Sequence, residues 1–143
     1  MAATAAIAAG ILQKALDEAI RGLKHKNNVH KNIMQVTGDM SETFKIRVET
    51  PEVLILKIQK PGRITLSLVR SGIFTAHVDG TVSHIVASED VVYQRSYRSD
   101  KGGYANSFSV INGDILSIAM EAHHFCSEVL GQGSSEMDVI LKY

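Results

Sequence analysis

Hydrophobic and polar positions change their period once along the chain, near residue 28. Over residues 4–25 the apolar side chains recur at spacings of three, four and seven, which is the pattern of an amphipathic helix. The apolar face of this predicted helix consists of Ile7, Ile11, Leu12, Ala15, Leu16, Ala19, Ile20 and Leu23. Asn27 and Asn28 follow a basic last turn and are expected to end the helix.

After residue 28, apolar and polar residues alternate in short runs, as in strands with one face toward solvent. Nine or ten strands are predicted, near residues 32–37, 43–49, 53–59, 63–70, 73–78, 81–87, 90–98, 106–111, 115–123 and 137–142. Short strands at this spacing, without helices between them, predict an antiparallel sandwich or barrel. We expect the sandwich: a mainly β protein with one N-terminal amphipathic α-helix.

Turn-forming residues separate these runs. Lys60-Pro61-Gly62 suits a tight turn, with Pro at the first central position and Gly at the second. Asp79-Gly80 and Asn112-Gly113 are each flanked by two apolar runs, and each predicts a two-residue hairpin.

Length and composition are those of one compact domain, with 143 residues of which 45% are hydrophobic and 21% charged. We expect a single domain over 1–143, with the helix and a link in 1–28 and the sandwich in 29–143. Fifteen basic residues balance fifteen acidic ones. Nucleic acid is therefore not an expected partner, because phosphate binding needs an excess of clustered positive charge.

The first 13 residues carry no charge. A basic segment before the apolar stretch and a cleavage site after it, which a secretion signal needs, are both missing. We therefore expect a secreted or cytoplasmic protein without a recognisable signal peptide. Residues 2–12 are apolar on all sides, which favours contact with another helix, a partner groove or a membrane interface. The alternative is that the small alanines are tolerated in water.

Motifs of enzymes and cofactor sites are missing from the sequence, so we expect no catalytic residue and no cofactor. Across the predicted hairpin at 79–80, His77 and His84 would share one sheet face; His123, His124 and Cys126 form a second cluster. A metal ion needs three or four converging ligands, and consecutive strand residues point to opposite faces. We therefore predict surface histidines and no metal site, and an enzyme that uses these histidines is a minor alternative.

Four residues suggest a binding surface. Tyr93, Arg95 and Tyr97 alternate on one face of a predicted strand, and the following loop leads to Tyr104. Tyrosines beside an arginine can receive a quaternary ammonium group, stack on a sugar ring or lie at a bilayer interface. We predict that these four residues bind a lipid headgroup or a sugar; the alternative is that they cover a sheet edge or the core.

An amphipathic, Ala- and Gly-containing N-terminal helix that begins without charge and precedes an all-β body resembles the actinoporins, pore-forming cytolysins whose helix leaves a β-sandwich to line a membrane pore. Residues 29–44 look similar to the family's first strands, and 60–63 to the turn before its central strand, so the resemblance covers about residues 3–70. It implies recognition of phosphocholine lipids by an aromatic cluster, for which this chain, without Trp, offers tyrosines. Related sandwiches, the fungal fruit-body lectins, bind sugars.

The leading hypothesis is therefore a membrane-active toxin that is membrane-associated when active. The sandwich would dock on lipid and residues 2–24 would insert, with a homo-oligomer forming the pore because charged residues of the helix are costly alone in hydrocarbon. The inserting side chains would be Ile7, Ile11, Leu12, Leu16, Ile20 and Leu23. The alternative is a non-enzymatic lectin-like or effector-type binding module whose helix packs on the sandwich or mediates dimerisation. Exposure of residues 2–12 would favour the pore-forming protein, and deep burial of these residues would favour the binding module.

Overall fold

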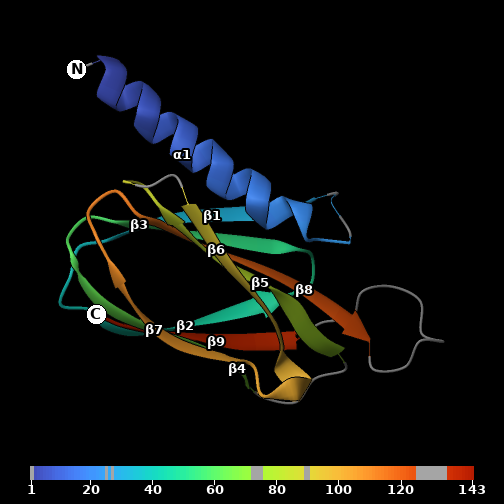
Figure 1. The fold of residues 1–143 in the computed structure, drawn as a ribbon. Helices are drawn as coiled ribbons and strands as arrows, with labels where there is room; N and C mark the ends of the chain where they lie inside the picture. Colours follow the sequence, from blue (N-terminus) through green and yellow to red (C-terminus); the bar gives the residue numbers. More distant parts are fainter. Residues whose placement is uncertain (1, 25, 27, 72–75, 89–90, 125–134) are drawn as a thin grey trace.

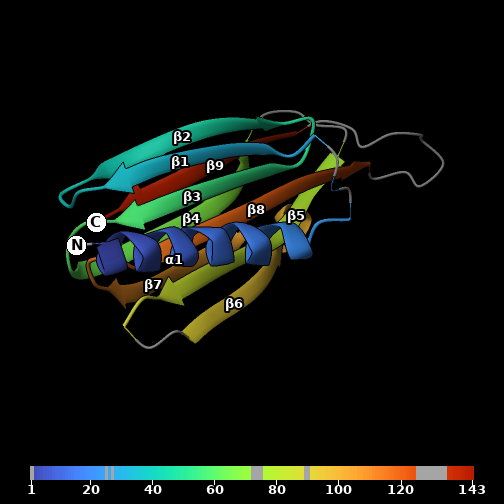
Figure 2. The same cartoon turned by 90° about the horizontal axis from the view of Figure 1, so that it is seen from above.

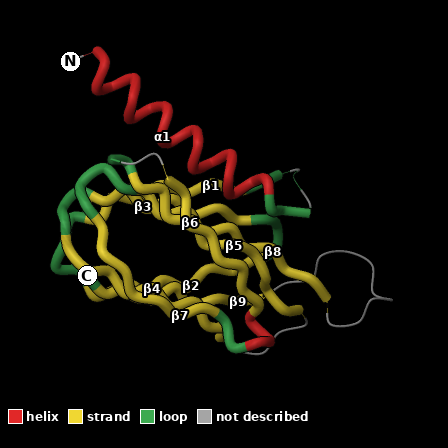
Figure 3. Tube along the Cα trace, viewed as in Figure 1, coloured by secondary structure: helices red, strands yellow, loops and turns green. Residues whose placement is uncertain are grey.

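The fold is a two-layer β-sandwich with one helix on its outside (Figures 1 and 3). The computed structural model describes residues 2–24, 26, 28–71, 76–88, 91–124 and 135–143, with the backbone alone for 2–10 and 124. In this part of the chain the elements are α1 (Ala2–Arg21), β1 (His30–Val36), β2 (Ser41–Val48), β3 (Glu52–Ile58), β4 (Gly62–Ser71), β5 (Ala76–Val86), β6 (Val91–Arg98), the short 3₁₀ helix η1 (Ser99–Lys101), β7 (Tyr104–Val110), β8 (Ile115–His124) and β9 (Ser135–Lys142). The predicted mainly β sandwich is confirmed.

The strands form a five-stranded sheet in the order β1-β3-β8-β5-β6 and a four-stranded sheet in the order β2-β9-β4-β7. The pairs are antiparallel except for β1 and β3, which are parallel. This departs from the all-antiparallel prediction. The reason is that the chain crosses to the other sheet as β2 and returns, which is the long connection that a parallel pair requires.

The main core lies between the two sheets and follows from the alternation of side chains along each strand. In β4, for example, Ile64, Leu66 and Leu68 are fully buried, whereas Thr65 and Ser67 are half-buried on the other face. The run in β3 is apolar on both faces because one face packs in this core and the other packs under the helix.

The two predicted hairpins are wrong. Asp79-Gly80 lies inside β5, which runs unbroken through the two strands predicted at 73–78 and 81–87. Gly80 serves close packing: a Cβ atom there would lie 1.9 Å from the carbonyl oxygen of Ala119 in the neighbouring strand. Asn112-Gly113 does form a turn, with Gly113 at φ 97°, but it joins strands of different sheets.

Helix α1 lies on the outer face of the five-stranded sheet, across β8 (Figure 2). Ala15, Ala19 and Leu23 are buried there in a second apolar cluster with Val53 and Ile55 of β3, and with residues of β5 and β8. The small side chains of the alanines let the helix backbone approach the sheet, and the hydroxyl of Ser117 donates a hydrogen bond of 3.3 Å to the Ala15 carbonyl. The docked half of the helix is therefore part of the fold.

The helix ends at Arg21, earlier than the predicted end at residue 25. Gly22 follows, which is a poor helix former, and the backbone N–H of Lys24 donates to the carboxylate of Glu121 in β8. The helix therefore ends close to the point where the backbone binds a carboxylate of the sheet.

Of the side chains predicted to enter a membrane, most contact the sheet. Leu23 is buried, and Ile11, Leu12, Leu16 and Ile20 are partly buried against the second cluster. The side chain of Ile7 lies outside the described part. In Figure 1 the N-terminal end of α1 stands further from the strands than its C-terminal end. The side chains of residues 11 and 12 are thus partly buried on the sheet, and those of residues 2–10 lie outside the described part, so the prediction for residues 2–12 stays a prediction.

We expect Ala19→Leu to destabilise the protein, because the larger side chain has no room between helix and sheet. Overpacking of this kind costs about 1–3 kcal/mol of unfolding free energy, measurable by urea denaturation. Gln13→Leu is the matched control: the same residue is introduced on the exposed side of α1, so the change should stay within about 0.5 kcal/mol. Equal effects of the two substitutions would show that the docked face is not packed.

Candidate ligand-binding groove

A groove of about 560 Å³ lies between β6 and β7, the edge strands of the two sheets on the same side of the sandwich (Figure 2). Its size falls in the range of small-molecule sites. The residues that line it include Tyr93, Arg95, Tyr104, Asn106, Phe108 and His84. Three of the four residues predicted to bind a headgroup or sugar are thus brought together here.

Tyr93, Arg95 and Tyr97 follow one another on the same face of β6, as their spacing predicts, yet their environments differ. Tyr93 is 59% exposed, Arg95 is exposed, and Tyr97 is buried in the core. The hydroxyl of Tyr97 donates a hydrogen bond of 2.8 Å to the carbonyl of Ala119, and burial raises the pKa of this hydroxyl well above its usual value. Tyr97 is therefore a support below the groove and offers no surface to a ligand.

Tyr104 forms the wall of the groove opposite β6. Its ring is packed edge-on against Tyr97, with the ring centres 6.4 Å apart, and the guanidinium carbon of Arg95 lies 5.7 Å from the centre of the Tyr104 ring. This is cation–π geometry. The contact joins the two edge strands across the opening and holds a positively charged donor at the wall.

His84 contributes a second wall of the groove, whereas the sequence predicted only a surface histidine at this position. Its ring stacks on Phe108 at 5.1 Å between centres, and its Nε2 donates to Asp114 at 2.9 Å. Asp114 is buried and also accepts hydrogen bonds from the backbone N–H groups of Ala87 and Ile111, both at 3.1 Å. One carboxylate therefore fixes the imidazole and ties together the loops at this end of the sandwich.

The predicted pairing of His77 with His84 on one face is wrong. Because β5 is continuous, residues seven apart point to opposite faces. His84 faces the groove, whereas His77 lies on the outer face directly across from His123 of β8. Burial, and then the charge of Arg98, lower the pKa of His77. For the other predicted cluster, Cys126 and the side chain of His124 lie outside the described residues.

Comparisons with known proteins add little to this description. No protein-family model matches the chain, and the curated proteins yield no match either. Among solved structures, the chain is similar to the pre-peptidase C-terminal domain of collagenase from Bacillus anthracis, at 11% identity over 82% of this chain and 100% of that one, with a TM-score of 0.49. A likeness this low supports no argument about function. The resemblance to actinoporins stays a prediction.

We expect Asp114→Ala to destabilise the protein by about 3 kcal/mol, because hydrogen bonds to a buried charged group contribute about 1.5–3 kcal/mol each and do not add fully. Asp114→Asn keeps one acceptor oxygen and should lose about half as much. Urea denaturation of the three proteins tests this order. Equal stability of all three would show that Asp114 does not organise this end of the sandwich.

Proposed function

We propose that the protein is a lectin-like binding module that takes a carbohydrate in the groove between β6 and β7. The observation that carries the proposal is the convergence of an exposed ring, Tyr93, with an arginine and the amide of Asn106 on an open groove. A sugar ring offers an apolar face for stacking and hydroxyls for hydrogen bonds, which is the combination that these side chains complement. The walls are fixed by buried contacts, so little order has to be gained on binding.

The position of Arg95 favours a sugar over a phosphocholine headgroup. Its guanidinium already lies over the Tyr104 ring, so a cation occupies the aromatic face that a quaternary ammonium group would need there. Toward a sugar, the same guanidinium is a donor of hydrogen bonds to hydroxyl groups. Carbohydrate is therefore the ligand class that we assign to the groove.

We expect Tyr93→Ala and Arg95→Ala each to weaken carbohydrate binding at least tenfold, because each removes a contact that the ligand makes directly. Screening on a glycan array finds the ligand, and calorimetry with the strongest hit gives the affinity. Arg47→Ala is the matched control for charge: Arg47 is exposed on β2, the edge strand farthest from β7 in its sheet.

Three results would count against the proposal. They are an array without a hit, a hit whose affinity is unchanged by both groove variants, and equal weakening by Arg47→Ala. Binding of free phosphocholine that Tyr93→Ala abolishes, with no glycan bound, would return the assignment to a lipid headgroup.

Membrane insertion of α1 is the second candidate function. It is favoured by the uncharged first 13 residues and by the N-terminal end of α1, which lies further from the strands than its C-terminal end (Figure 1). Insertion would require Ala15, Ala19 and Leu23 to leave the sheet, which exposes the second apolar cluster. Within the described residues, none of the helical segments has both the length and the apolarity for a membrane crossing. Because insertion would expose the second apolar cluster, we rank this function below carbohydrate binding.

Deletion of residues 1–26 separates the two candidates. If the helix is a fixed part of the sandwich, as its buried face suggests, the truncated chain will be insoluble or unfolded, because the outer face of the sheet loses its cover. A pore former would instead yield a soluble sandwich that no longer lyses. Circular dichroism reports the fold, and dye release from phosphatidylcholine vesicles reports lysis. Leakage by the full chain at low protein-to-lipid ratio would establish the second candidate.

A further inference from the structure

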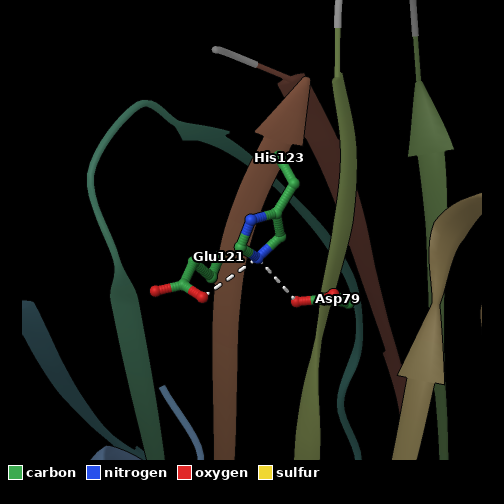
Figure 4. A group of neighbouring side chains, drawn as sticks. All are labelled: Asp79, Glu121 and His123. Carbon is green, nitrogen blue, oxygen red and sulfur yellow. Dashed lines mark hydrogen bonds and ion pairs between the residues drawn. The ribbon is translucent and has the colours of Figure 1, made fainter. Parts of the chain in front are cut away.

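Two histidines and two carboxylates meet on the outer face of the five-stranded sheet, away from the groove. In the register of β5 with β8, His77 lies opposite His123 and Asp79 lies opposite Glu121. Figure 4 shows the imidazole of His123 turned between the carboxylates of Asp79 and Glu121. The ligand atoms of these three residues all lie within 4.8 Å of one another.

One ring nitrogen is shared between both carboxylates. The Nε2 of His123 lies 3.0 Å from a Glu121 oxygen and 3.1 Å from an Asp79 oxygen. A single N–H group can form a linear hydrogen bond with only one of the two oxygens. A metal ion, in contrast, accepts a lone pair from the nitrogen and from both oxygens at once. The same Glu121 oxygen accepts the backbone N–H of Lys24 at 3.2 Å. Such an outer hydrogen bond orients a ligating carboxylate.

This cluster places two carboxylates side by side. Asp79 and Glu121 are direct cross-strand neighbours, and like charges in that position are destabilising. Glu121 is only 2% exposed, so water screens its charge poorly. Arg98, the cross-strand neighbour of Asp79 in β6, forms a two-fold ion pair with Asp100 at 2.9–3.0 Å. The space between the two carboxylates, where His123 points, is where both of them can contact one cation.

We propose that Asp79, Glu121 and His123 bind a divalent transition-metal ion of the Zn²⁺ type. Zinc bonds of about 2.0–2.2 Å in a tetrahedral site separate the ligand atoms by about 3.4 Å. The separations from His123 are a few tenths of an ångström shorter, so a small outward shift of the side chains admits the ion. A mixed nitrogen and oxygen set suits zinc, whereas Ca²⁺ and Mg²⁺ select oxygen ligands.

The fourth position faces His77, whose Nε2 lies 3.6 Å from the second oxygen of Asp79. Either this imidazole or a water molecule completes the tetrahedron. The side chains of Asp79 and His123 are 25% and 18% exposed, so an ion can enter from solvent. Bound there, the metal would link β5 to β8 and, through the Lys24 hydrogen bond, to the end of α1. Its role is to hold these elements together.

The test uses the full-length protein, freed of metal with a chelator and titrated with ZnCl₂ in a calorimeter. We expect one Zn²⁺ per chain and a rise of the thermal unfolding midpoint by about 5–10 °C at a hundredfold excess over Kd. With Co²⁺ instead, we expect the visible absorption of a tetrahedral site, which needs no variant and therefore does not depend on how the variants fold.

His123→Ala and Asp79→Asn should each weaken Zn²⁺ binding at least tenfold and remove most of the shift in unfolding midpoint. His30→Ala is the matched control, because His30 is an exposed histidine that also pairs with a carboxylate, Glu52, at 2.7 Å. It should leave both quantities unchanged. If His123→Ala does not fold, Asp79→Asn decides, since it retains the shape of the side chain.

The proposal is overturned if the metal-free protein binds no Zn²⁺ at one per chain. It is overturned equally if Asp79→Asn binds as tightly as the wild type, or if Ca²⁺ raises the unfolding midpoint and Zn²⁺ does not. In those cases the cluster is a network of hydrogen bonds and ion pairs without a metal ion.

Discussion

Burial of β8 on both faces is the constraint on which the rest of the structure depends. From Ile115 to Ala122 every residue is at most 3% exposed. The even-numbered side chains, such as Leu116 and Ile118, fill the core between the sheets, and the odd-numbered ones, such as Ile115 and Ala119, meet the helix. A strand of this kind cannot face water, so both the second sheet and α1 are needed to cover it. Docking of the helix follows from this requirement more than from helix propensity.

The groove, in contrast, depends on exposure: it lies where an edge strand of one sheet faces an edge strand of the other. β6 and β7 end their sheets, and edge strands present unpaired backbone groups that proteins protect with bulky or charged side chains. Here Arg95 and Tyr104 bridge the two edges, and the stacked pair of His84 and Phe108 forms the second wall. Both pairs have one member from each sheet. The distance between the sheets, set by the aliphatic core, therefore also sets the width of the groove.

The spacing of apolar and polar residues predicted those elements that depend only on residues close together in the sequence. The alternation in β4 and the stripe from Ile11 to Leu23 each reflect a single element against its environment, and the elements were recovered with small errors at their ends. Partners across strands were not predictable, because register depends on residues far apart in sequence. Asp79-Gly80 has the composition of a turn, yet it lies inside β5. A glycine is needed at position 80 because a Cβ atom would collide with the carbonyl oxygen of Ala119. That misreading split β5, put His77 beside His84, and hid the pairing of Asp79 with Glu121.

The same contact at Gly80 connects the two sites. Tyr97 donates to the Ala119 carbonyl over Gly80, and its ring supports Tyr104 in the groove. Gly80 follows Asp79 directly, and Glu121 stands two residues after Ala119 on the same face of β8. A metal ion between the two carboxylates would hold β5 and β8 together next to this hydrogen bond. The support under Tyr104 would then be stiffer with metal bound, whereas His84, anchored by Asp114 at the other end of β5, would be unaffected. The two walls of the groove thus rest on separate polar anchors, and only one of them is tied to the proposed ion.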